Sequence, residues 1–287
     1  AVGIYGKNSQ ITNTGNIKTT GDITALNTLN AGKIIAEGNV SILDLENRNE
    51  LVINKLLTTN NLTNTGALST GEGIISNGNA INHGELKTNG SFVINGNLNN
   101  YNILNVGNIL STRDLLNYGN LKAVEKLLTR GTTFYNQGEI LASNLDVETL
   151  GNISNSNKIV VLEDSRLKGN NVTNTGYISS TNLDIITPTF TNSGAIEADE
   201  KITANNTTLN NTGYIGSNQE LNLNGSNISN QGKLESANIE MNNLFAYNNL
   251  GGIINSNRVI LSSNGSLTLN GSLHGENYVK VQSFSGD

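Results

Sequence analysis

Hydrophobic residues recur in short alternating runs along the whole chain. Between one repeat and the next, Ile178, Leu183, Ile185 and Phe190 are separated by polar residues, and the neighbouring stretches show the same spacing. Alternation of apolar and polar positions over a few residues is typical of a half-buried β-strand. Gly, Asn and Ser fill the gaps, as turns require. The pattern predicts three short strands in each stretch of about 18 residues.

A five-residue unit, Asn-x-Gly-x-(Ile or Leu), marks the start of each stretch and is called the anchor below. Asn13-Thr-Gly-Asn-Ile17 and Asn174-Thr-Gly-Tyr-Ile178 are two examples, and Asn sometimes replaces the Gly. The anchors are centred at positions 15, 32, 49, 66, 84, 102, 119, 138, 157, 176, 194, 213, 232 and 251, so successive anchors are 17 to 19 residues apart. Such a regular period indicates a repeat architecture.

Strands this short cannot bury a face alone, but stacked coils can. We therefore predict an all-β, right-handed parallel β-helix of about 14–16 coils, each with 17–19 residues and three short strands. The right-handed sense is inferred because crossover connections between parallel strands are nearly always right-handed. We expect one domain over residues 1–287, with an irregular terminal coil or cap from about residue 267, because the anchor due after Ile253 is missing and Asn270 comes late.

Each anchor residue has an expected structural role. Gly is expected to turn the corner in a left-handed backbone conformation. The anchor Asn is expected to bond to the same Asn one coil away, because its amide can both donate and accept. This predicted ladder comprises Asn64, Asn82, Asn117, Asn136, Asn155, Asn174, Asn192, Asn211 and Asn230, among other anchors. Leu121, Val124 and Leu128 have helix-like spacing, but they lie between regular anchors and favour a distorted coil over a helix.

Composition excludes several classes of protein. Asn occurs 54 times, charged residues make up 14% of the chain, and the net charge is −6. The scattered Lys and Arg argue against a nucleic-acid surface, and the absence of a long apolar run argues against a membrane-spanning helix. With no Cys and only His83 and His274, disulfides, thiol catalysis and a multi-His metal site are excluded. We expect no cofactor and no metal.

The repeat resembles that of a known family. Leu29-Asn-Ala-Gly-Lys-Ile-Ile-Ala36, followed by Gly38-Asn-Val40, and Leu62-Thr-Asn-Thr-Gly-Ala-Leu-Ser69 are similar to the haemagglutinin-type repeats of filamentous haemagglutinin-like exoproteins of Gram-negative bacteria. The resemblance also extends to autotransporter passengers and covers about residues 4–270. It implies a secreted fibre, tethered to the outer membrane, that is used for adhesion or for contact-dependent delivery of a toxin. An outer-membrane transporter would be its partner during export, and a protein or glycan receptor on a host or bacterial cell its partner afterwards.

The chain shows no secretion, barrel or toxin segment, and Ala1-Val-Gly-Ile-Tyr5 has neither an initiator Met nor a signal peptide. We therefore expect it to be a piece of something larger.

Many β-helix proteins are enzymes that act on polysaccharides, so paired carboxylates are candidate catalytic groups. Asp146 and Asp184 are expected to point outward on one sheet, with Glu163, Asp164 and Arg166 in the coil between them. A glycosidase needs two carboxylates about 5–10 Å apart. A solvated face is the simpler interpretation, and we predict no catalytic residue.

Exposed rings offer a possible surface contact. Tyr177 and Tyr214 directly follow their anchor Gly and are expected to face solvent, where they could contact a carbohydrate or a protein. His83 is expected to be an exposed turn residue.

The favoured function is a non-enzymatic shaft or adhesin segment. Two alternatives remain: the stalk or receptor-binding region of a contact-dependent growth inhibition toxin, and a polysaccharide lyase or hydrolase.

Overall fold

The computed structural model describes residues 2–283 and confirms an all-β parallel β-solenoid of about 15 turns with roughly 18 residues per turn. The chain divides into two compact units, Ala1–Ser143 (unit 1) and Asn144–Asp287 (unit 2), which are described separately. Over residues 2–283, no helix has the length and apolar character needed to cross a membrane.

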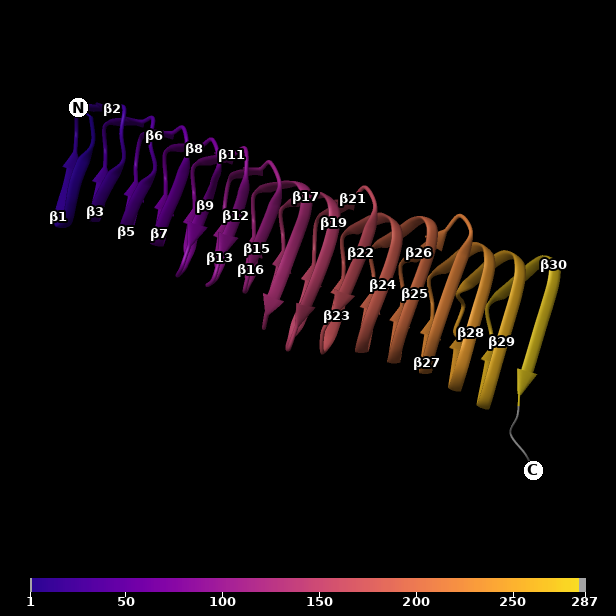
Figure 1. Cartoon of the computed structure of the whole chain (residues 1–287). Coiled ribbons are helices and arrows are strands. Elements are labelled where there is room, and N and C mark those ends of the chain that lie inside the picture. Colours follow the sequence, from indigo (N-terminus) through magenta and orange to yellow (C-terminus); the bar gives the residue numbers. More distant parts are fainter. Residues whose placement is uncertain (1, 284–287) are drawn as a thin grey trace. The chain divides into compact units, whose positions relative to one another are not determined.

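Successive strands go round each coil, and equivalent strands of neighbouring coils lie side by side (Figure 1). Unit 1 contains β1 (Ile4–Asn13), β2 (Asn16–Thr19), β3 (Ile23–Asn30), β4 (Lys33–Ala36), β5 (Val40–Asn47), β6 (Glu50–Ile53), β7 (Leu56–Asn64), β8 (Ala67–Thr70), β9 (Gly73–Ser76), β10 (Ala80–Asn82), β11 (Glu85–Thr88), β12 (Ser91–Ile94), β13 (Leu98–Asn100), β14 (Ile103–Val106), β15 (Ile109–Thr112), β16 (Leu115–Asn117), β17 (Asn120–Gly131) and β18 (Phe134–Asn136). The chain passes from unit 1 to unit 2 within β19 (Glu139–Thr149).

Unit 2 continues with fewer and longer strands. They are β20 (Asn152–Asn155), β21 (Lys158–Val161), β22 (Asp164–Lys168), β23 (Asn171–Asn174), β24 (Tyr177–Asn192), β25 (Ala195–Asn211), β26 (Tyr214–Ser217), β27 (Glu220–Asn230), β28 (Lys233–Asn249), β29 (Ile253–Leu269) and β30 (Ser272–Ser283).

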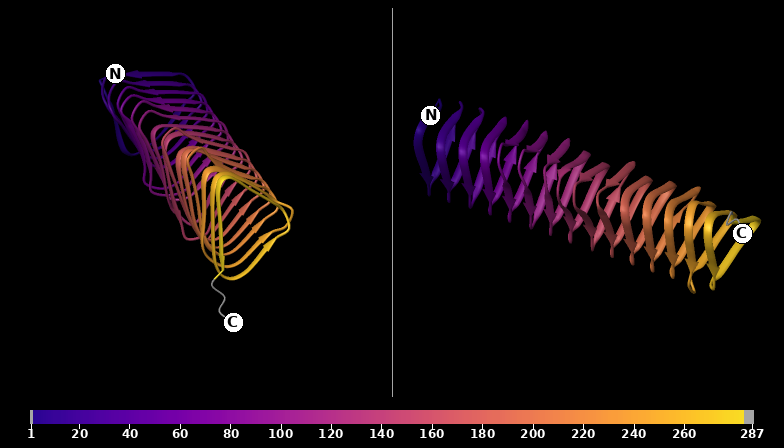
Figure 2. Two further views of the ribbon diagram at one scale, coloured as in Figure 1. Left: turned by 90° about the vertical axis from the view of Figure 1, so that its right-hand side faces the viewer. Right: turned by 90° about the horizontal axis from the view of Figure 1, so that it is seen from below.

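Each coil has three sides, which are visible end on in Figure 2. The first side begins just after the anchor, the second follows it, and the third ends at the next anchor Asn. In unit 1 one coil is formed by β8, β9 and β10, and in unit 2 one coil is formed by β21, β22 and β23. In later coils of unit 2 the sides run together, so that β24 and β25 each bend through all three.

The core forms because identical positions of successive coils pair in parallel register. Leu68 pairs with Leu86, and Leu86 pairs with Leu104, so inward side chains stack on their equivalents along unit 1. In unit 2, Phe190 pairs with Leu209 in the same way. These residues are all buried, and burying their apolar surface stabilises the stack. The predicted alternation within each strand is therefore confirmed.

The segment with helix-like spacing is a strand, as predicted. It lies in β17, whose two halves pair with β14 and β15. Leu121 and Leu127 are buried, whereas Val124 is exposed.

The predicted role of the anchor Gly is wrong. Among the glycines of residues 2–283, only Gly73 and Gly251 have a positive φ, so most anchors do not turn the corner in the left-handed conformation. The reason for Gly is close stacking instead: a Cβ added at Gly32 would overlap the carbonyl oxygen of Gly15, and one at Gly213 would overlap that of Gly194. Asn takes the place of the anchor Gly in three coils, so the preference for Gly at this position is strong but not absolute.

The last anchor contains an extra residue that the sequence pattern did not reveal. Ile254 is buried and pairs with the buried Leu234, whereas Ile253 is 47% exposed. The inserted residue is accommodated at Gly251, whose φ of 83° lies in the left-handed region that Gly tolerates. The expected inward residue is therefore shifted by one position.

Within the described residues, Ser272–Ser283 continue the parallel stack along the first two sides of a further coil. β30 pairs in parallel with β29, placing Val279 beside Val259 and Val281 beside Leu261. Both Val279 and Val281 are exposed. Residues 284–287 lie outside the described part of the chain.

Candidate functional site

Buried Asn side chains form a continuous ladder in each unit. Each Nδ2 donates to the Oδ1 of the anchor Asn one coil later, at 2.8–2.9 Å. The ladder runs through Asn13, Asn30, Asn47, Asn64, Asn82, Asn100, Asn117 and Asn136 in unit 1, and through Asn155, Asn174, Asn192, Asn211, Asn230 and Asn249 in unit 2. All of these side chains are buried.

The same Nδ2 also reaches backbone oxygens at the corner. Asn64 Nδ2 is 3.1 Å from the Gly66 carbonyl and 3.0 Å from the Glu85 carbonyl of the next coil. In unit 2 the ladder ends at Asn249, because Leu269 pairs with Asn249 and takes the place of the next Asn. The ladder is therefore a structural element that satisfies buried polar groups.

Asp146 and Asp184 share one sheet face, as predicted, but Arg166 stands between them. Asp146 pairs with Arg166, and Arg166 pairs with Asp184, on the second side of unit 2. Arg166 Nη1 lies 3.5 Å from both Asp146 Oδ1 and Glu148 Oε2. Burial raises the pKa of Asp184, and the positive charge of Arg166 opposes that rise. This outward face is therefore a mixed-charge ion-pair network.

Glu163 and Asp164 lie in the coil between Asp146 and Asp184, as predicted, and contact amide side chains of the neighbouring coils. Asp164 pairs with Asn182, whose Nδ2 donates to Asp164 Oδ1 at 3.0 Å. Glu163 is exposed and accepts from Asn144 Nδ2 at 2.8 Å.

Tyr177 and Tyr214 are half-buried rather than fully exposed, and each donates to a glutamate of the next coil. Tyr177 Oη is 2.7 Å from Glu197 Oε2, and Tyr214 Oη is 3.2 Å from Glu235 Oε2. Gly216 lies under the Tyr214 ring, where a Cβ would overlap the phenol group. The two pairs repeat the same contact two coils apart on the first side of unit 2.

These contacts shift the ionisation of the groups involved. Burial, followed by the negative charge of Glu235, raises the pKa of Tyr214 to about 12. Glu235 has a lowered pKa because Lys233 and Asn255 donate to its carboxylate. Lys233 Nζ is 2.7 Å from Glu235 Oε2 and lies 5.6 Å from the centre of the Tyr214 ring. The Glu235 carboxylate therefore has its hydrogen-bond donors and its counter-charge within the chain.

A shallow groove of about 290 Å³ lies beside these pairs in unit 2. Its lining includes the apolar side chains of Val160 and Leu162, the carboxylates of Glu197 and Asp199, and the Tyr214 ring. A second hollow, of about 370 Å³, shares Ser217 and Asn218 with it and is lined by Glu235, His274 and Glu276. We call the first hollow the unit 2 groove. No sequence signal pointed to it, since its walls come from four successive coils.

Unit 1 carries a stack of aromatic rings on exposed anchor positions. His83 lies parallel to Tyr101 at 4.4 Å between ring centres, and Tyr101 lies parallel to Tyr118 at 5.1 Å. Tyr118 then meets Tyr135 edge to face. The expectation that His83 is exposed is confirmed. Because stacked rings cover one another's faces, most of the flat surface that a sugar would pack against is already occupied.

Across residues 2–283, no group of three or more His, Asp or Glu side chains could hold a metal ion. The clustered polar groups form ladders, ion pairs and the unit 2 groove.

Comparison of the sequence with protein-family models, with curated proteins and with solved structures finds no match in any of the three. The class that the fold defines is a parallel β-solenoid with stacked asparagine ladders.

Proposed function

We propose that this chain is a non-enzymatic shaft segment of a large, surface-exposed bacterial exoprotein, which mediates adhesion or supports a distal functional region. The observation that carries the proposal is the repetition of one coil design, with each buried Asn bonded to the next coil. Each coil contacts its neighbours alone, so length can be added without a new core. A repeat that can be lengthened in this way is suited to a supporting shaft.

The anchor motif supports a particular class of exoprotein. Asn-x-Gly-x-(Ile or Leu) at 17 to 19 residues resembles the repeats of filamentous haemagglutinin-like proteins, which are exported across the outer membrane. The absence of Cys is compatible with such export, because a disulfide would hinder threading of the chain. We propose a secreted location, tethered to the outer membrane of a Gram-negative bacterium.

The carboxylates favour a support over a polysaccharide-cleaving enzyme. Arg166 lies between Asp146 and Asp184 in the strand register and contacts Asp146 at 3.5 Å. Glycosidic cleavage requires substrate between the two carboxyl groups.

Surface labelling tests the proposal. Antibodies raised against the purified chain should label intact cells of the producing bacterium, and permeabilisation should add little signal. Label that is confined to permeabilised cells would contradict the proposed location. In a parallel assay, purified chain should release no reducing ends or unsaturated sugars from acidic and neutral polysaccharides, and reproducible turnover would overturn the non-enzymatic assignment.

A further inference from the structure

One carboxylate on the first side of unit 2 holds a lysine and an asparagine amide together. Lys233 Nζ lies 2.7 Å from Glu235 Oε2, and Asn255 Nδ2 donates to Glu235 Oε1 at 2.8 Å. Lys233 and Glu235 belong to β28, whereas Asn255 belongs to β29 of the next coil. An amine, a carboxylate and an amide group are therefore brought together from two coils.

The strand register sets how far the two side chains have to reach. Lys233 pairs with Ile253 and Glu235 pairs with Asn255, so Lys233 and Asn255 are diagonal neighbours on the first side. Neighbouring strands lie about 4.8 Å apart and each residue rises about 3.3 Å, which separates the two Cα atoms by about 8 Å. A lysine and an asparagine side chain joined end to end can span that distance.

The Tyr214 ring packs against this group from the preceding coil. Its centre lies 5.6 Å from Lys233 Nζ, and its Oη donates to Glu235 Oε2 at 3.2 Å. The side chains of Lys233 and Glu235 are 41% and 35% exposed, and Asn255 is half-buried. Holding reacting groups side by side removes much of the entropic cost of forming a bond between them.

We propose that Lys233 and Asn255 form an intramolecular amide bond, with Glu235 as the catalytic proton carrier. The Lys233 ammonium transfers a proton to Glu235, and the neutral Nζ attacks Cγ of Asn255. Glu235 passes the proton to Nδ2, and the Cγ–Nδ2 bond breaks. Nζ gives up a second proton through the same carboxylate, so that ammonia departs as ammonium. An ammonium group and a primary amide thus become a secondary amide and an ammonium ion, and no oxidant or other co-reactant is required.

The ion pair defines the starting point of this reaction. The pKa of Glu235 is lowered because Lys233 and then Asn255 donate to its carboxylate. The resting state is therefore carboxylate with ammonium, and we expect a slow step that occurs once, after folding. The product would join β28 to β29 covalently. The proposal goes beyond the shaft function, which stands or falls separately, since a shaft needs no such bond.

Peptide mapping of the purified chain tests the proposal. After incubation of the folded protein, a protease that cleaves after Glu should release residues 221–235 and 241–276 as one joined species. This species should be lighter by one ammonia than the two peptides together. The joining is the decisive observation, because succinimide formation at an Asn-Gly sequence also loses ammonia but links no peptides. Protein kept unfolded in urea should form no joined species.

Substitutions test the role of each group. Glu235→Gln, in which residues 221–240 replace 221–235 as the first peptide, should reduce the joined fraction at least about tenfold, because a side-chain amide cannot carry the proton. Lys233→Arg and Asn255→Ala should each abolish the joined species.

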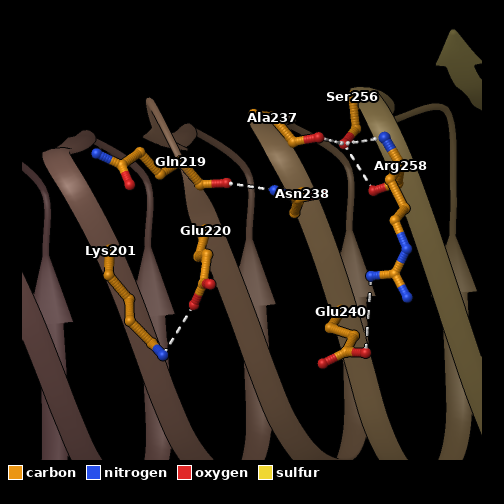
Figure 3. Close-up of polar contacts among 8 residues, drawn as sticks. All are labelled: Lys201, Gln219, Glu220, Ala237, Asn238, Glu240, Ser256 and Arg258. Atoms are coloured by element: carbon orange, nitrogen blue, oxygen red, sulfur yellow. Dashed lines mark hydrogen bonds and ion pairs between the residues drawn. The ribbon is translucent and has the colours of Figure 1, made fainter. Parts of the chain in front are cut away.

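The matched control uses an ion pair on the second side of unit 2. Lys201 Nζ lies 2.8 Å from Glu220 Oε2 (Figure 3), and Lys201→Arg should leave the joined fraction within about twofold, because the site is separate. Absence of the joined species from the folded chain would overturn the proposal. Its persistence in Lys233→Arg or Asn255→Ala, or an equal loss in Lys201→Arg, would do the same.

Discussion

The anchor Asn solves a local problem of backbone satisfaction. At each corner, the short Asn side chain reaches carbonyl groups of its own coil and of the next one. Asn192 Nδ2 lies 3.3 Å from the Gly194 carbonyl and 3.0 Å from the Tyr214 carbonyl, in addition to its 2.8 Å contact with Asn211 Oδ1. Its own Oδ1 accepts from Asn174. One amide therefore serves two coils, which explains its recurrence at every coil.

Removing one rung should cost more than removing an exposed amide. Asn192→Ala deprives Asn174 of its acceptor and Asn211 of its donor inside the core. We expect the free energy of unfolding in urea to fall by about 2–3 kcal/mol, since buried groups lose partners. Asn210→Ala, on the neighbouring strand β25 and exposed, should change it by less than about 0.5 kcal/mol. Equal effects would contradict the structural role of the ladder.

Tyr247 offers the opposite case, in which a buried polar atom harms stability. The side chain is fully buried, and its hydroxyl has no hydrogen-bond partner. Burial also raises the pKa of this phenol. We expect Tyr247→Phe to raise the free energy of unfolding by about 1 kcal/mol, because an unsatisfied group is removed.

The reciprocal change provides a control for Tyr247. Phe190 occupies the same inward column of the third side, connected through Leu209 and Ile228. Phe190→Tyr should lower the melting temperature, since it buries a new hydroxyl. A loss of stability in Tyr247→Phe would show that this hydroxyl is satisfied in solution.

At the scale of the element, each strand depends on its position in the stack rather than on its own length. β10 has three residues and β16 has three, too few to be stable alone. Each is held because parallel partners lie on both sides: Ala80 of β10 pairs with Leu62 and with Leu98. The corners between strands must therefore stack as closely as the strands themselves.

The effect of substituting an anchor glycine on stability should depend on whether a Cβ would overlap the backbone of the preceding coil. A Cβ at Gly66 would overlap the carbonyl oxygen of Asn49, whereas one at Gly15 would meet nothing within 4 Å. We expect Gly66→Ala to reduce the free energy of unfolding by about 2 kcal/mol, since overpacking forces the backbone apart. Gly15→Ala should be neutral or slightly stabilising. Similar losses for both variants, measured by thermal melting, would contradict the stacking explanation.

At the scale of the whole molecule, the repeat predicts that whole coils can be removed. Lys158 pairs with Tyr177 in register, so deletion of residues 158–176 places Tyr177 where Lys158 was. We expect this variant to remain folded, with β-type circular dichroism and a cooperative thermal transition, because each coil interacts only with its neighbours.

A deletion that is not a full turn provides the control. Removing residues 158–167 deletes the first side and most of the second and joins Asn157 of the anchor to Lys168, so inward and outward residues no longer match those of the next coil. A shift out of register exposes apolar side chains. We expect aggregation or loss of the transition, and equal tolerance of both deletions would contradict the solenoid model.

The sequence by itself determined the solenoid. Its period, the inward positions and the Asn ladder are local features of the sequence. They repeat so often that a single strand register buries the equivalent residues of nearly all coils. The tertiary structure decided what depends on single departures from that period. One inserted residue buries Ile254 instead of Ile253, and a β-bulge sets Thr181 opposite both Asp199 and Glu200. Likewise, stacking rather than backbone freedom accounts for most anchor glycines. A shift of one residue redirects a side chain to the opposite face, so periodicity determines the coil, whereas spatial contacts between coils determine the surface chemistry.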